Sequence, residues 1–147
     1  MMIKPILAIS SLLLISTHLT NAHAIQVLTR CPNSSNCVSS QTDRLDQEHF
    51  IAPFIIKGDA TQAWIALQTI LKSQSRTRLT QIDDKSLQAE TTSLIFHFVD
   101  DIQAILNVEA NLIDIRSASR VGFGDFGVNR NRIEQLRILL QQGGFIE

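Results

Sequence analysis

The sequence predicts an α+β fold: a twisted antiparallel sheet of about five to six strands with two main helices packed on it. Two segments carry apolar residues at helical spacing, one over residues 60–73 and one from near Asn131 to Gly143. Between them, short stretches that alternate apolar and polar residues are separated by polar turns. This order of elements favours helices gathered on one face of a meandering sheet.

The chain begins with the three zones of an export signal. Lys4 supplies a positive start, residues 6–15 are mostly apolar, and Ala22-His23-Ala24 is a small-x-small cleavage site. We therefore expect cleavage near Ala24 and a mature protein that is periplasmic or secreted. The predicted parts are a signal peptide (1–24), a polar lead-in loop with a cysteine pair (25–48) and a single α+β domain (49–147).

An uncleaved membrane anchor and a lipid anchor are weaker interpretations of this segment. A spanning helix needs about 20 apolar residues, and serine, threonine and histidine interrupt this stretch between Ser10 and Thr20. The first cysteine, Cys31, follows Leu28-Thr29-Arg30 and does not directly end the apolar stretch, which disfavours lipidation. We expect no transmembrane segment in the mature chain.

The charge balance argues against one class of partner. Removing Lys4 with the signal peptide reduces the 13 basic side chains to 12 against 14 acidic ones, a formal charge of −2. No segment interleaves basic and aromatic residues. A nucleic-acid partner is therefore not predicted.

The lead-in loop and the first predicted strand come next along the chain. Residues 25–48 are polar and rich in turn formers, with no sustained period. The apolar run over residues 50–57 predicts a strand. Pro53 within it lacks an amide donor and so indicates an edge position.

The first predicted helix covers residues 60–73. Asp59 is its expected N-cap, with Gln62 as a capping-box partner three residues later. Apolar residues then recur at helical spacing, and Trp64 among them is expected in the core.

The centre of the chain predicts the remaining strands, over residues 79–82, 87–91, 94–99, 102–108 and 112–119. The segment 94–99 is almost wholly apolar, which is typical of a central strand covered on both faces. His97 within it is interpreted as a hydrogen-bonded sheet histidine. Residues 102–108 alternate with a period of two, and a turn at Ala110-Asn111 leads into the last strand.

The second predicted helix begins near Asn131. Asn129 or Asn131 is its expected cap, together with Glu134, and Ile133, Leu136 and Leu140 lie at helical spacing. Gly143-Gly144 is expected to end the helix.

Three segments together resemble the domain of unknown function family 1499, which is found in bacteria and in plastids. They are residues 31–40 (CPNSSNCVSS), 98–101 (FVDD) and 116–132 (RSASRVGFGDFGVNRNR). Ser35 stands where a proline is usual in the family, and Gly124 where a serine is common. The resemblance implies an exported or membrane-associated protein and supplies no mechanism.

Cys31 and Cys37 are the only cysteines, and both follow the predicted cleavage site. In an oxidising compartment we expect them to form a disulfide that staples the lead-in loop. A nucleophilic thiol and a redox-active pair are the alternatives. No metal site is predicted, because there is no second cysteine pair and only His49 and His97 remain after cleavage.

A candidate polar cluster comprises Asp100, Asp101, Arg116, Arg120, Asp125, Asn129, Arg130 and Arg132. Arg116 and Arg120 share one face of an extended segment. We expect Asp100 and Asp101 in the turn that opens the preceding strand, so that an antiparallel return brings a carboxylate toward these arginines. The cluster is either an architectural network that fixes the sheet register or an anion pocket.

The segment before the last helix likewise allows a binding or an architectural interpretation. Gly122, Gly124 and Gly127 surround Asp125, and a glycine-rich loop at a helix N-terminus can present backbone donors to an anion. The spacing matches neither a phosphate loop nor a dinucleotide motif. The alternative is a tight connection in which Asp125 and Asn129 cap backbone groups.

These residues support three hypotheses about function. The first is a non-enzymatic binding or accessory module that recognises an anionic small molecule, a lipid head group or an envelope protein. The alternatives are an enzyme that acts on an anionic small substrate through aspartate and arginine residues, and a purely structural envelope protein. No cofactor is predicted, and the serines lack the Gly-x-Ser-x-Gly elbow of a hydrolase.

Overall fold

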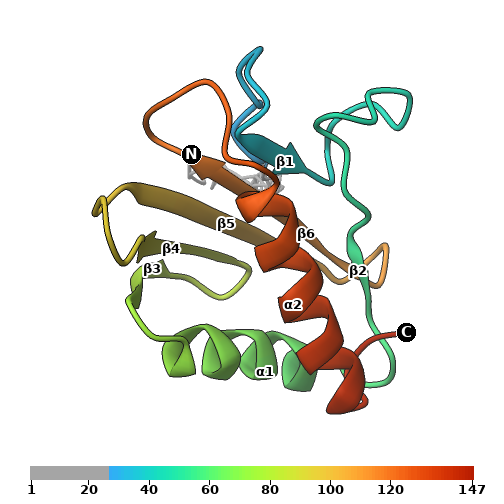
Figure 1. The fold of residues 1–147 in the computed structure, drawn as a ribbon. Coiled ribbons are helices and arrows are strands. Elements are labelled where there is room, and N and C mark those ends of the chain that lie inside the picture. The colour runs from blue at the N-terminus through green and yellow to red at the C-terminus, as the bar shows by residue number, and fades with distance from the viewer. Residues whose placement is uncertain (1–26) are drawn as a thin grey trace, which may run out of the picture.

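The computed structural model describes residues 27–147, and the predicted signal peptide with its cleavage site lies outside them. The elements of the described part are β1 (Cys37–Ser39), β2 (Phe54–Ile55), α1 (Ala60–Ser73), β3 (Thr77–Ile82), β4 (Ser86–Thr92), β5 (Val99–Asn107), β6 (Leu112–Ser119) and α2 (Val128–Gln142). They form a six-stranded antiparallel sheet with two helices, as the sequence predicts (Figure 1).

Strands β3 to β6 form a meander, and the two short strands β1 and β2 pair with its last strand. β3, β4, β5 and β6 are successive antiparallel neighbours, and β1 and β2 pair with different parts of β6. The register places Ile102 opposite Ser117 and Ala104 opposite Ile115. Because side chains alternate along each strand, this register gives the sheet two unlike faces.

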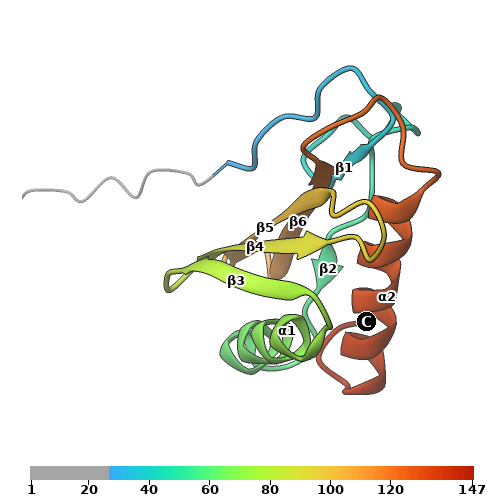
Figure 2. The same ribbon diagram turned by 60° about the vertical axis from the view of Figure 1, so that its left-hand side comes forward.

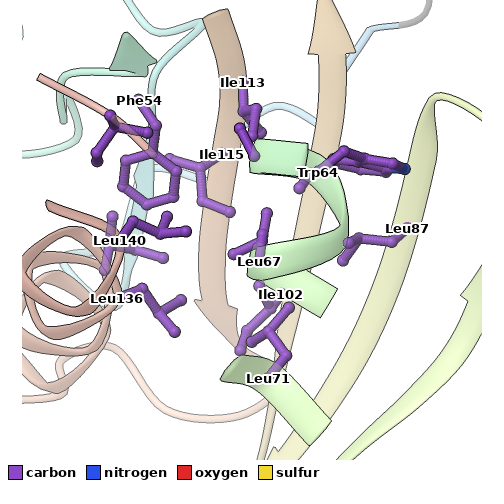
Figure 3. Close-up of a cluster of buried hydrophobic side chains, with 14 of the residues drawn as sticks. Phe54, Trp64, Leu67, Leu71, Leu87, Ile102, Ile113, Ile115, Leu136 and Leu140 are labelled. Atoms are coloured by element: carbon purple, nitrogen blue, oxygen red, sulfur yellow. The ribbon is translucent and has the colours of Figure 1, made fainter. Parts of the chain in front are cut away.

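Both helices pack on one face of the sheet, which we call the inner face (Figures 1 and 2). The opposite face is the outer face. Trp64 is 4% exposed and lies in the core, as predicted. Figure 3 shows the side chains that meet between the helices and the sheet: Trp64, Leu67 and Leu71 of α1, Leu136 and Leu140 of α2, and Leu87, Ile102, Ile113 and Ile115 of the sheet.

The first helix has the predicted bounds. The Asp59 Oδ1 atom accepts a hydrogen bond from the amide of Gln62 at 2.8 Å, which satisfies one of the free donors of the first turn. The buried residues of α1 recur at helical spacing, so the helix lays one apolar stripe on the sheet.

The second helix begins three residues before Asn131, and its capping prediction is wrong. The N-cap position is Gly127, at φ 80°, and it makes no side-chain cap. The Asp125 carboxylate accepts from the amides of Gly127 (2.9 Å) and Asn129 (2.8 Å) instead. Asn129 lies in the first turn, 1% exposed, and is committed to the interior. The helix ends at Gly143 as predicted.

The predicted central strand over residues 94–99 is wrong. Residues 93–98 form the loop between β4 and β5, and its four large apolar side chains are at least 51% exposed. The Ser93 amide donates to the Phe98 carbonyl at 2.9 Å, which closes the loop. His97 is exposed at φ 54°, so it is not a sheet histidine. Apolar content alone does not distinguish a buried strand from an exposed loop.

The lead-in segment, predicted as a polar loop, also contains a strand. It contributes β1 to the sheet, and its Ser39 amide donates to the His49 carbonyl at 2.8 Å. The strand predicted over residues 50–57 contracts to Phe54 and Ile55, directly after Pro53. Among residues 27–147, no helix is long and apolar enough to cross a membrane.

Candidate polar pocket and its surroundings

Asp100 and Asp101 lie inside β5, not in a turn before it. The strand alternation sends Asp100, which is 7% exposed, to the inner face, and Asp101 to the outer face. Arg116 and Arg120 share the outer face with Asp101. The sheet therefore divides the predicted polar cluster into two groups.

The outer cluster consists of Arg120, Asp101 and Glu90. Arg120 binds Asp101 with two hydrogen bonds, Nε to Oδ2 at 2.9 Å and Nη2 to Oδ1 at 2.7 Å, and Glu90 also pairs with Arg78 at 2.6 Å. Hydrogen bonds from Arg120 and then Arg78 lower the pKa of Glu90, and Asp101 and Glu90 raise the pKa of Arg120. The Arg120 and Asp101 side chains are 46% and 37% exposed, so this ion pair contributes little to stability.

Arg116 lies beside this cluster and outside it. It is 8% exposed, and within residues 27–147 its Nε atom has no hydrogen-bond partner and no ion pair includes it. Burial lowers the pKa of Arg116, and the nearby Asp101 carboxylate opposes this shift only in part. The guanidinium is thus largely removed from water with weak compensation.

The inner cluster is built around Arg132 of α2. Its Nη2 atom contacts Asp100 Oδ2 at 2.6 Å, and its Nη1 atom donates to Ser117 Oγ at 2.9 Å and to Asn129 Oδ1 at 2.7 Å. The side chains of Arg132 and Asp100 are only 20% and 9% exposed. The guanidinium is therefore held in one orientation by β5, β6 and α2.

Asn129 connects the inner cluster to the lead-in segment. Its Nδ2 atom donates to the Asn36 carbonyl (3.0 Å), Ser119 Oγ (2.9 Å) and Asp125 Oδ2 (2.7 Å), and its Oδ1 atom accepts from Ser117 Oγ. Every polar atom of this buried amide is satisfied, as such groups require. The contacts indicate an architectural role for Asn129.

The glycine-rich loop before α2 provides no free anion site at its amides. The Asp125 carboxylate already accepts from the amides of Gly127 and Asn129, in the place where a bound anion would lie. Arg130 turns away and donates to the carbonyls of Gln47 (3.2 Å) and Glu48 (3.0 Å). This geometry favours the tight-connection interpretation of the loop.

A pocket of about 360 Å³ opens beside the inner cluster. It lies between the end of α1, the first turns of α2 and the adjoining strands β3, β4 and β5. Its polar lining comes from Gln74, Ser75, Arg76, Thr77, Thr91, Thr92, Ser93, Asp100, Asn131, Arg132 and Gln135. Of the predicted cluster, only Asp100 and Arg132 line this pocket.

Arg76 is the pocket residue that sequence reasoning missed. It precedes β3 at φ 60°, and its Nε atom donates to the Thr92 carbonyl at 3.1 Å. Among residues 27–147, no ion pair includes Arg76. No motif surrounds it in the sequence, and only the hairpin of β3 and β4 brings it near Arg132.

The predicted disulfide is present. Cys31 and Cys37 are bonded with a Cα–Cα distance of 5.6 Å, and no free cysteine occurs in the described residues. Within the lead-in segment the bond ties Cys31 to the first residue of β1, which pairs with β6. The cysteines therefore hold the edge of the sheet.

A second cavity, of about 570 Å³, is formed mainly by the lead-in segment, and Asp46 and His49 are among the residues that line it. His49 Nδ1 lies 2.8 Å from Asp46 Oδ2, and Nε2 lies 3.1 Å from the Ser34 carbonyl. Burial disfavours the charged ring, but the acceptors on Asp46 and Ser34 outweigh it and raise the pKa of His49. Because both ring nitrogens are engaged, this pair is structural.

The geometry defines a small α+β domain, stapled by a disulfide, with an arginine-lined pocket between its helices and the sheet. A family model described as Protein of unknown function (DUF1499) matches residues 27–140, and the chain belongs to this family. This confirms the resemblance in the sequence. No curated protein matches the chain.

Proposed function

We propose that the protein is an exported, non-enzymatic binding module that holds a small anionic group in the pocket between α1 and α2. Export is supported by the charged start, short apolar stretch and small-x-small site of residues 1–24. The disulfide is compatible with an oxidising compartment.

The observation that carries the proposal is the meeting of two arginines in one pocket with a single carboxylate. Arg132 of α2 and Arg76, which directly precedes β3, both line the pocket, and Asp100 is its one acidic residue. Their formal charges leave an excess of one positive charge. Arginine presents several donors in a fixed plane, which suits carboxylate and phosphate oxygens. Hydroxyl and amide groups around the arginines supply further polar contacts.

The pocket also suits binding because the Arg132 guanidinium is already held in place before a ligand binds. Three contacts fix the Arg132 guanidinium, so less side-chain entropy is lost when a ligand binds. The volume of about 360 Å³ lies at the lower end of the range for ligand pockets, which fits a small group.

The same contacts favour binding over acid–base catalysis. The one carboxylate of the pocket, Asp100, is committed to Arg132 and is not a free base. The two alternatives to anion binding are an enzyme that acts on an anionic substrate and a purely structural protein.

Calorimetric titration with inorganic phosphate and glycerol phosphate tests this proposal. Arg76→Gln should weaken binding by about tenfold to a hundredfold, because a hydrogen bond to a charged group is lost. Arg44→Gln, an exposed arginine in the lead-in segment, is the matched control and should bind like the wild-type protein. Equal affinities for all three proteins, or no binding of either anion, would contradict the proposal.

A further inference from the structure

Exposed apolar side chains are concentrated on two loops. Of the sixteen large apolar side chains exposed in residues 27–147, eight lie in the β4–β5 loop (93–98) and in the β6–α2 loop with the first residue of α2 (120–128). They are Leu94, Ile95, Phe96, Phe98, Val121, Phe123, Phe126 and Val128. We call this surface the apolar tip.

The two loops lie at the same end of the sheet (Figures 1 and 2). The amide of Arg120, where the second loop begins, donates to the carbonyl of Val99, where the first loop ends, at 3.0 Å. The rings of Phe96 and Phe98 stack with centroids 5.5 Å apart. The tip is therefore one surface that two connections build together.

The backbone of both loops is fixed while their apolar side chains stay in solvent. The amide and hydroxyl of Ser35 both donate to the Phe123 carbonyl at 3.0 Å, and Asn36 Nδ2 donates to the Gly122 carbonyl at 2.8 Å. Phe123 and Phe126 are nonetheless 89% and 105% exposed. Phe126 also adopts φ 53°, a conformation that a residue with a side chain rarely takes. The folded chain thus holds these rings outward.

The charges around the apolar tip are arranged for an anionic surface. Residues 93–98 contain no acidic side chain, and the single acid of the second loop, Asp125, is engaged by backbone amides. Arg76 lies beside the first loop, where its Nε atom donates to the Thr92 carbonyl, and within residues 27–147 no ion pair includes it. The Arg120 guanidinium, at the start of the second loop, is engaged by Asp101 and Glu90. Apolar residues that enter a membrane interface, with a cationic side chain beside them at the level of the head groups, have this distribution.

We propose that the apolar tip docks the protein onto the surface of a phospholipid bilayer. Ser93 of the first loop and Val128 of the apolar tip both line the 360 Å³ pocket. Docking therefore brings the pocket against the head groups. That the head-group phosphate enters the pocket rests on the proposed function, whereas docking itself does not. Two separate loops with outward rings fit a yielding lipid interface better than the flat, packed surface of a protein partner.

Vesicle sedimentation tests the docking, with protein purified from the envelope-soluble fraction. Wild-type protein should sediment with vesicles of phosphatidylcholine and phosphatidylglycerol, and more weakly with phosphatidylcholine alone. The triple variant Phe96→Ser/Phe123→Ser/Phe126→Ser should lose about tenfold or more in apparent affinity, because three rings no longer leave water. Leu45→Ser/Ile82→Ser/Val108→Ser removes three exposed apolar residues elsewhere and should sediment like wild type.

The fluorescence of Trp64, buried in the core, reports whether each variant is folded. A second variant, Phe123→Trp, should shift its emission to the blue when vesicles are added. Equal sedimentation of wild type and the tip variant, or no blue shift, would overturn the docking. So would self-association, or binding of a protein partner, that the tip variant loses while no vesicle binding occurs.

The two experiments distinguish failure of the docking proposal from failure of the anion-pocket proposal. Vesicle binding that depends on the tip, together with no binding of soluble phosphate, supports docking and contradicts the anion pocket. Phosphate binding that depends on Arg76, together with no vesicle binding, supports the pocket and overturns docking.

Discussion

The ion pair between Asp100 and Arg132 should stabilise the fold, because it is largely buried and joins β5 to α2. Loss of one partner from a fully buried pair costs about 3–5 kcal/mol, and an exposed pair contributes about 0–1 kcal/mol. With exposures of 9% and 20%, this pair lies between these limits. We expect Asp100→Asn to lower the free energy of unfolding by about 2–3 kcal/mol.

A double-mutant cycle separates the pair from other effects of the substitutions. Asp100→Asn, Arg132→Gln and the double variant are compared by urea denaturation, with the fluorescence of Trp64 as the signal. We expect a coupling energy of about 1.5–2 kcal/mol, since Arg132 keeps its contacts to Ser117 and Asn129 in Asp100→Asn.

The outer cluster supplies the matched control. Asp101→Asn and Arg120→Gln remove an ion pair of similar geometry whose side chains are far more exposed, so their coupling should be clearly smaller. Additivity of the Asp100 and Arg132 substitutions within about 0.3–0.5 kcal/mol would refute the reasoning. An equal coupling in the two clusters would refute the role assigned to burial.

Three further predictions concern stability. Replacing Cys31 and Cys37 by serine should lower the free energy of unfolding by about 2 kcal/mol in urea denaturation without loss of the fold, because the disulfide closes a short loop. An unfolded variant would show that the hydrophobic core alone does not hold the domain folded. His49 has a raised pKa, so its stabilisation is complete below its usual pKa of 6.5 and is lost as pH rises through the folded value. The stability difference from His49→Gln should thus shrink between weakly acidic and alkaline pH, and a constant difference would contradict this. Asn129→Ala should lower the free energy of unfolding by about 2–3 kcal/mol, measured by thermal denaturation. The substitution leaves the buried Asn36 carbonyl with one hydrogen bond fewer and the Ser117 hydroxyl without its acceptor. A loss below about 0.5 kcal/mol would show that this hydrogen-bond network is dispensable for stability.

The elements that the sequence predicts best are those whose local signals agree with their packing. Asp59, the helical spacing after it and a buried stripe all specify α1. The period of two over residues 102–108 agrees with the alternating burial of β5. The strand prediction for residues 94–99 is wrong because the large apolar side chains of this segment are exposed to solvent, although apolar residues are usually buried. Its misassignment coincides with the surface for which we propose a binding role.

The sequence identifies several of the polar residues around the candidate site, but it does not predict which of them lie together. The strand face shared by Arg116 and Arg120 follows from the alternation of side chains. Starting β5 at Val99 puts Asp100 and Asp101 within the strand and on opposite faces, which no local signal indicated. Arg76 comes near Asp100 and Arg132 only when the β3–β4 hairpin pairs with β5 and α2 packs on the sheet, and these contacts join residues far apart in the sequence.

Native mass spectrometry of the protein purified from its own cell envelope tests the central claim most directly. The account predicts a bound anionic molecule, a phosphate ester or a phospholipid, whose occupancy falls in Arg76→Gln and is unchanged in Arg44→Gln. A protein that carries no ligand, or that carries the same ligand at equal occupancy in Arg76→Gln, would contradict the claim that this pocket binds an anionic group.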